Sequence, residues 1–449
     1  MEEMRDMTKG NISKQMIVFA VPLMVGNMFQ QLYGIINAVI VGRYLGKESL
    51  AAIGTAIPIM NIMLFLLFGM TMGASVLMAE FFGSGDEKLL KDEISTSALS
   101  GCIFTIILST GGVLSIKPLL MLINTPHEIV AESELYLKII FSGLIFAFIY
   151  DLMSSAMRAV GESFVPLLFL IASSILNIIL AVVFVEYMDL GISGAAYATV
   201  ASQLVSALLC LGYIKVKIPQ IIPKSFFKLS PALLAKTVSY SSVSGVQQTV
   251  LYVGIFLLQG AVNKLGIDSI AAFNAACRID SFILAPSDSL ASSLMMFASQ
   301  NKGAGEHFRV KCGLKYSMYI NFACTSACSI MLFLIPGVLA SMFLNPAENS
   351  AISIASDYLK IMSVIYLLSP LCNTMQGFFR GIGKMDVTLY ATIIQIPIRV
   401  AFSYALVSFM DLNAVAAAIA LGWIFMGLYL LLEYKKYLKT DNDHILRKV

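Results

Sequence analysis

Long apolar runs dominate the chain, and polar residues gather in short stretches between them. The runs reach roughly 20 residues or more, the length that an α-helix needs to cross about 30 Å of hydrocarbon. The pattern predicts an all-α integral membrane protein with twelve transmembrane helices. The expected spans are 16–41, 52–79, 94–116, 133–157, 164–185, 192–214, 237–262, 271–299, 313–335, 352–377, 387–409 and 414–435.

Short motifs repeat along the chain and divide it into two similar halves. The residues LGKESLAA at 45–52 return as LGIDSIAA at 265–272. The other matched segments, at nearly the same spacing, are 83–86 with 303–306, 136–138 with 358–360, 158–161 with 380–383, and 188–190 with 410–412. The repeat predicts two homologous six-helix lobes. Because each lobe has an even number of spans, both insert in the same direction, and we expect a pseudo-two-fold axis along the membrane normal.

The polar stretches also set the expected domain boundaries. The longest connection, 215–236, contains three prolines and indicates a linker between an N-lobe at 16–214 and a C-lobe at 237–435. Polar tails remain at 1–15 and 436–449.

Charge sets the expected orientation in the membrane. Hydrophobic residues make up 58% of the chain and charged residues only 13%, which excludes a soluble globule. Most of the 30 Lys and Arg residues fall in the tails and in the loops on the same side as the tails. The positive-inside rule therefore predicts a cell-membrane protein with both termini cytoplasmic. The net charge of +3 reflects those loops, so we expect no nucleic-acid partner.

The chain lacks the sequence motifs of ATP hydrolysis, enzyme catalysis and metal binding. No GxxxxGK[ST] phosphate loop is present, which excludes pumping driven by the chain's own ATP hydrolysis. The three histidines fall in loops or the tail, and no Ser/His/Asp set or carboxylate cluster suggests an enzyme. The seven cysteines form no CxxC motif and are interpreted as packing residues. We therefore expect neither an enzyme nor a resident metal or cofactor.

Ionisable residues at membrane depth are costly and are candidates for function. The eighth span is the richest, with Arg278, Asp280 and Asp288 on either side of Pro286. On a helix the two aspartates lie about 80° apart and about 12 Å along the axis, so they can line one polar face. The proline leaves the carbonyl of Phe282 without its helical donor. Carboxylates beside such a carbonyl can hold a proton or a small hard cation.

Arg399 and Asp151, within spans, and Arg158, at the inner end of the fourth span, favour structural roles. Arg399 is in the middle of the eleventh span, where a lone arginine is more often an internal charge partner than a substrate ligand. Asp151 and Arg158 share a face of the fourth span, about 10 Å apart along the helix axis, and are interpreted as a network that anchors it. Uncharged polar residues such as Asn177 and Gln247 are most simply interhelical hydrogen-bonding groups.

Short sequence motifs occur in order along the chain, and no single motif is specific for one protein family. They are Pro22 with 29–33 (FQQLY), 41–46 (VGRYLG), 50–52 (LAA), 83–86 (GSGD), 158–163 (RAVGES) with Pro166, 177–180 (NIIL), 278–282 (RIDSF) with Pro286, 299–301 (SQN), 303–305 (GAG) and 380–383 (RGIG). Together they resemble the multidrug and toxic compound extrusion (MATE) family over about residues 12–436. The resemblance implies a V-shaped pair of six-helix lobes and export of organic cations and amphipathic compounds in exchange for H⁺ or Na⁺. No cofactor is implied.

The chain departs from the family pattern in its first lobe. Many prokaryotic members carry aspartate where this chain has Asn37 and again where it has Ala181, so the usual acidic pair is missing. We hypothesise that coupling resides in the eighth span, at Asp280 and Asp288. Asn37, Asn177, Gln247 and Arg278 are then expected at the substrate cavity.

Two alternatives remain open at this point. A lipid-linked oligosaccharide flippase shares the architecture, but we expect its cavity to hold several Arg and Lys residues for pyrophosphate. A non-transporting membrane sensor would bind ligand without flux. The abundance of Met (25) and Phe (28) suits a cavity that adapts to flat, apolar cations. The sequence leaves open the exported compound, the choice between H⁺ and Na⁺, and the oligomeric state.

Overall fold

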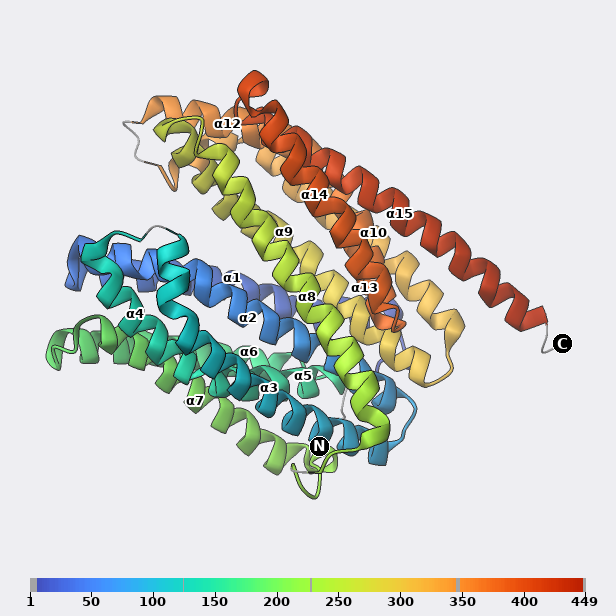
Figure 1. Ribbon diagram of the computed structural model, residues 1–449. Helices are drawn as coiled ribbons and strands as arrows, with labels where there is room; N and C mark the ends of the chain where they lie inside the picture. The colour runs from blue at the N-terminus through green and yellow to red at the C-terminus, as the bar shows by residue number, and fades with distance from the viewer. Residues whose placement is uncertain (1–5, 124, 227, 345–347, 447–449) are drawn as a thin grey trace. The chain divides into compact units, whose positions relative to one another are not determined.

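The computed structural model describes residues 6–123, 125–226, 228–344 and 348–446, and the regular structure in those ranges is helical, without strands (Figure 1). The first half of the chain forms α1 (Ile12–Tyr44), α2 (Gly46–Gly83), α3 (Glu87–Leu122), α4 (His127–Ser142), α5 (Leu144–Ala159), α6 (Phe164–Val182), the π-helical turn η1 (Val183–Tyr187), α7 (Gly191–Lys217) and the 3₁₀ turn η2 (Pro219–Ile221).

The second half forms α8 (Pro231–Val262), α9 (Ile267–Gly303), α10 (His307–Leu334), α11 (Pro336–Ser341), α12 (Asn349–Ile365), the 3₁₀ turn η3 (Tyr366–Leu368), α13 (Ser369–Gly381), α14 (Met385–Met410) and α15 (Asn413–Leu446). Among the described residues, 11 helical segments are long and apolar enough to cross a membrane, and α4 with α5 make a twelfth as a bent pair. The expected all-α membrane architecture is confirmed.

Two expected spans are broken rather than continuous. The fourth span bends by 44° between α4 and α5, at Gly143. A Cβ atom there would lie 2.5 Å from the side chain of Val200 in α7, so the glycine allows close helix packing at the bend. The tenth span is interrupted by η3, because Pro370 cannot donate the helical hydrogen bond to the carbonyl of Tyr366.

The sequence repeat recurs in the backbone. Left-handed φ values are rare outside glycine, so their positions mark local structure sharply. The matched pairs are Gly46 and Gly266 (80° and 94°), Gly85 and Gly305 (72° and 76°), Gly161 and Gly383 (87° and 81°), and Asp189 and Asp411 (51° and 48°). Each pair occupies equivalent positions of the two halves. The duplication is therefore one of three-dimensional structure as well as of sequence.

The described residues divide into two compact units. The first contains residues 21–249 with two short segments, 6–10 and 299–307, and the second contains 11–20, 250–298 and the chain from 308 onward. Helices α1, α8 and α9 each contribute residues to both units. The expected lobe limits at 214 and 237 stay predictions.

The expected linker 215–236 is hydrogen-bonded to the start of α3, within the first unit. The hydroxyl of Ser95 lies 2.7 Å from the carbonyl oxygen of Ser225 and accepts a hydrogen bond from the amide of Lys228 at 3.2 Å. The amide of Ser230 donates to the Thr96 hydroxyl at 3.1 Å. The linker is thus fixed by polar contacts, which its length and prolines did not predict.

Within the same unit, the C-terminal ends of α2 and α9 approach each other at two glycines. A Cβ atom on Gly83 would lie 1.9 Å from the carbonyl oxygen of Gln300, and one on Gly303 would lie 1.9 Å from that of Glu80. Both pairs occupy equivalent repeat positions, so the contact is reciprocal. Lys302 also pairs with Glu80 at 2.9 Å. We call this contact the glycine crossing.

Candidate functional site

The second unit holds Asp280 at the interruption of the tenth span. Asp280 projects from α9, and one of its carboxylate oxygens accepts a hydrogen bond from the hydroxyl of Tyr366 in η3. The Tyr366 ring is fully buried, and its centroid lies 6.1 Å from that of Trp423 in α15. The break imposed by Pro370 therefore places a rigid hydroxyl donor against the carboxylate.

Two residues that interact electrostatically with Asp280 carry unsatisfied polar atoms. Arg399 of α14 lies in electrostatic range of Asp280 and of Tyr358 in α12. The Nε atom of Arg399 and the hydroxyl of Tyr358 are buried and have no hydrogen-bond partner in the described structure. Buried polar groups are normally paired, so orphans around a carboxylate are consistent with a site that takes up a polar ligand, water or a proton.

Asp288 lies two turns further along α9, where its side chain is exposed, whereas that of Asp280 is half-buried. The amide of Asn373 in α13 donates to the Asp288 carboxylate at 2.8 Å and to the Ser287 hydroxyl at 3.1 Å. Arg380 acts on Asp288 electrostatically. Its guanidinium donates to Gln376 at 2.9 Å, while its buried Nε is unpartnered.

Asp280 and Asp288 are thus each matched by one donor from the broken tenth span and one arginine. Asp280 faces Tyr366 and Arg399, whereas Asp288 faces Asn373 and is influenced by Arg380. The predicted coupling pair lies in one compact unit, with Arg399 beside it.

Asp151 and Arg158 lie together on α5, in the first unit. The two side chains interact electrostatically, and the Arg158 guanidinium donates to the hydroxyl of Ser155 at 2.8 Å. Asp151 aligns in the repeat with Asn373, and Arg158 with Arg380, so the two halves hold related polar positions with different charge.

Replacing Asp151 with Asn should destabilise the protein, because Arg158 loses its charged partner and keeps only the hydrogen bond to Ser155. We expect a loss of up to about 1–3 kcal/mol, the penalty for an unmatched buried polar group, because both side chains are partly buried. The measurement is the midpoint of thermal aggregation in detergent, followed by size-exclusion elution. The double variant with Arg158→Gln should recover part of the loss, and equal loss in both variants would contradict the pairing.

The neutral residues predicted at the cavity lie in separate places. Asn177 of α6 is buried and donates to hydroxyls of Thr199 and Ser202 in α7, each at 3.3 Å. Gln247 of α8 is fully buried, and Arg278 of α9 is exposed. Asn37 falls within α1, but its side chain lies outside the described residues. Their role at a cavity stays a prediction.

Sequence reasoning missed the two tyrosines of the site. Tyr358 and Tyr366 fall in an apolar span and show no charge, so nothing marked them as partners of Asp280. The one available signal was Pro370, which predicts that the helix breaks four residues earlier.

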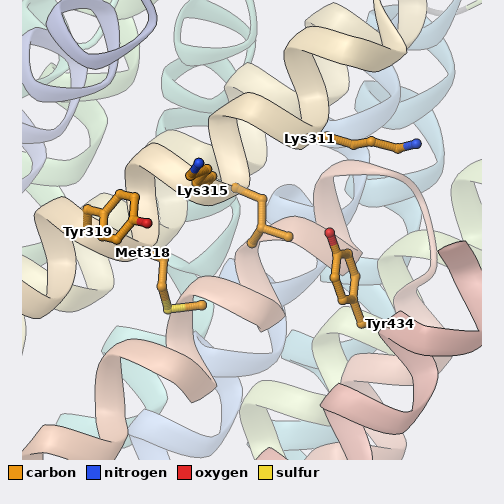
Figure 2. A pocket seen from close by; sticks show the side chains of 6 residues that line it. Lys311, Lys315, Met318, Tyr319 and Tyr434 are labelled. Carbon is orange, nitrogen blue, oxygen red and sulfur yellow. The ribbon is translucent and has the colours of Figure 1, made fainter.

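Two clefts lie away from the predicted coupling residues. The first, about 380 Å³, lies between α10 and α15, where Figure 2 shows Lys311, Lys315 and Tyr319 along one helix and Tyr434 on the other. The second, about 260 Å³, includes Lys138. Lysines beside apolar residues are common where side chains reach a membrane interface.

Membrane-length helices, a duplicated backbone and carboxylates within the helical bundle are features of membrane transporters. The sequence profile of the family described as MatE matches residues 22–183 and 226–405. The chain therefore belongs to the MatE family of multidrug transporters and is not an enzyme. The resemblance inferred from the short motifs is confirmed.

Individual relatives agree with this assignment. A probable multidrug resistance protein, YpnP of Bacillus subtilis, is 27% identical over 433 residues, covering 96% of each chain. The probable multidrug resistance protein NorM of Thermotoga maritima is 24% identical, covering 92% of this chain and 89% of that protein. The solved outward-facing conformation of a multidrug resistance MATE family transporter superposes with a TM-score of 0.90 at 22% identity, covering 98% of each.

Proposed function

We propose that this transporter exports organic cations and other amphipathic compounds in exchange for inward-moving H⁺ or Na⁺, by alternating access. Coupling occurs at Asp280, assisted by Asp288. The observation that carries the proposal is the arrangement around Asp280, a carboxylate held by one tyrosine hydroxyl among buried polar atoms that lack partners. Binding of an ion at such a site shifts the balance between two transporter conformations, provided the conformations differ in affinity.

The charge of Arg399 favours H⁺ over Na⁺ as the coupling ion. A sodium ion at Asp280 would face the guanidinium in a medium of low dielectric constant, where like charges repel strongly. A proton instead neutralises the carboxylate and leaves Arg399 as the remaining charge of the pair. Protonation therefore changes the electrostatic balance between α9 and α14 without placing a second cation there.

Proteoliposomes distinguish the ions directly. Vesicles loaded with ethidium are given either a pH gradient or a Na⁺ gradient, and the fall in internal dye is followed by fluorescence. We expect efflux to follow the pH gradient and to stop when a protonophore collapses it. Efflux that follows only the Na⁺ gradient would contradict the role given to Arg399, and no flux under either gradient would contradict drug antiport.

The same arrangement argues against a lipid-linked oligosaccharide flippase. Pyrophosphate recognition needs cationic side chains that are available to the ligand. Here Arg399 and Arg380 each act on a carboxylate, and Arg158 acts on Asp151. A sensor without transport would bind ethidium but give no flux in the vesicle assay.

The expected lobes, 16–214 and 237–435, insert in the cell membrane with both tails cytoplasmic. The support is the excess of Lys and Arg in the loops on the same side as the tails. A fluorescent protein fused at either end should fold and emit in cells, and a silent fusion at one end would contradict this orientation.

A further inference from the structure

Another acid, Glu93, lies buried in the first unit and takes no part in the proposed coupling. It occupies the second turn of α3 and has no exposed surface. The hydroxyl of Ser97 lies 2.9 Å from one carboxyl oxygen. The hydroxyl of Thr237, from α8, lies 2.9 and 3.0 Å from the two carboxyl oxygens and 3.0 Å from the carbonyl of Leu233.

The charged residues near Glu93 form ion pairs with other residues. Lys236 of α8 is the charged group that acts on it, but the Lys236 ammonium lies 3.7 Å from Glu80 of α2 and over the ring of Tyr240. Asp92, the neighbouring acid of α3, pairs with Lys228 at 3.0 Å. Within the described residues, no Lys or Arg nitrogen lies within ion-pairing distance of Glu93.

A buried carboxylate with hydroxyl partners alone is strongly disfavoured, whereas the neutral acid satisfies every group here. Its O–H can donate to the oxygen of Thr237, whose own proton then goes to the carbonyl of Leu233. The hydroxyl of Ser97 donates to the other carboxyl oxygen. We propose that Glu93 is a proton-binding site, separate from Asp280, which holds its proton while α8 packs against α3.

The position of Glu93 gives this proton a structural consequence. The hydroxyl of Thr237 is hydrogen-bonded to Glu93, and the ammonium of the adjacent Lys236 lies 3.7 Å from the carboxylate of Glu80. Glu80 belongs to the glycine crossing, where it pairs with Lys302. Loss of the proton places an unpaired charge between α3 and α8, and hydration of that charge requires the helices to separate. Protonation therefore stabilises the packed state of this end of the unit, which is the predicted cytoplasmic end.

Infrared spectroscopy tests the site without any transport assay. The purified protein at neutral pH should show a carbonyl-stretch band of a protonated carboxyl group that disappears in Glu93→Gln and moves in D₂O. The control is Glu87→Gln, an acid in the first turn of α3 that pairs with Lys91 on the surface. Glu93→Asp keeps an acid at the position, so a shifted band is expected even if Glu93→Gln folds poorly. Identical spectra of wild type, Glu93→Gln and Glu93→Asp would overturn the proposal.

The link to α8 is tested separately and rests on the proposed antiport. With the pH on the predicted cytoplasmic side varied, Glu93→Gln should retain at least half of the wild-type efflux at acidic pH and lose the wild-type change toward alkaline pH. If Glu93→Gln loses the infrared band but keeps the wild-type dependence of efflux on pH, the link between the Glu93 proton and α8 packing is overturned. If wild-type protein transports nothing, the proposed function fails, and the infrared result still decides the proton site.

Discussion

Replacing Asp280 with Asn is expected to reduce gradient-driven ethidium efflux to the level of protein-free vesicles. Asparagine has nearly the same shape and can still accept the Tyr366 hydrogen bond, but it cannot bind a proton or compensate the charge of Arg399. Transport should therefore fail while the protein still folds. The measurement is the initial efflux rate under an imposed gradient, beside thermal stability in detergent.

Two matched variants sharpen this test. Asp268→Asn removes an exposed acid from the first turn of the same helix and should leave efflux unchanged. Tyr366→Phe removes only the hydroxyl donor, and a hydrogen bond to a charged group contributes about 1.5–3 kcal/mol, which corresponds to a rate lowered by roughly tenfold to a hundredfold if it acts during transport. Full efflux by Asp280→Asn would remove coupling from Asp280, and full efflux by Asp288→Asn as well would move coupling away from α9.

The second large effect is expected at the glycine crossing. In Gly83→Ala the new methyl group would lie 1.9 Å from a backbone oxygen of α9, and no rotation of a side chain can relieve that overlap. Overpacking of this kind costs about 1–3 kcal/mol or more. The ends of α2 and α9 should be forced apart, with a lower melting temperature and efflux close to background. Gly303→Ala should behave in the same way, because the contact is reciprocal.

The control lies earlier in α2. A Cβ atom on Gly54 would meet nothing within 4 Å, so Gly54→Ala should be neutral or slightly stabilising, as alanine favours a helix by about 1 kcal/mol. Wild-type stability and efflux in Gly83→Ala would show that the crossing is looser than described. Equal losses in Gly54→Ala would mean that α2 tolerates no added methyl group.

Local features of the sequence predicted most of the architecture. Apolar runs long enough to cross a membrane required helices, since backbone groups in lipid must bond within their own segment. Repeated glycines such as Gly85 and Gly305 marked equivalent turns, because left-handed backbone favours glycine. The breaks were harder to predict. Pro370 signalled the interruption at η3, whereas Gly143 depends on its close contact with Val200 of another helix.

The candidate site divides in the same way. By itself, the sequence determined the helices, their duplication, the family, and the isolated acids Asp280 and Asp288, since the energetic penalty of a charge in lipid can be recognised residue by residue. The residues that contact these acids could be identified only from the tertiary structure. The contact of Tyr366 with Asp280 depends on the helix break in the tenth span. Glu93 lies one residue before its expected span, and its burial depends on contact with α8. Burial and pairing are properties of contacts between helices, which no single segment of the chain encodes.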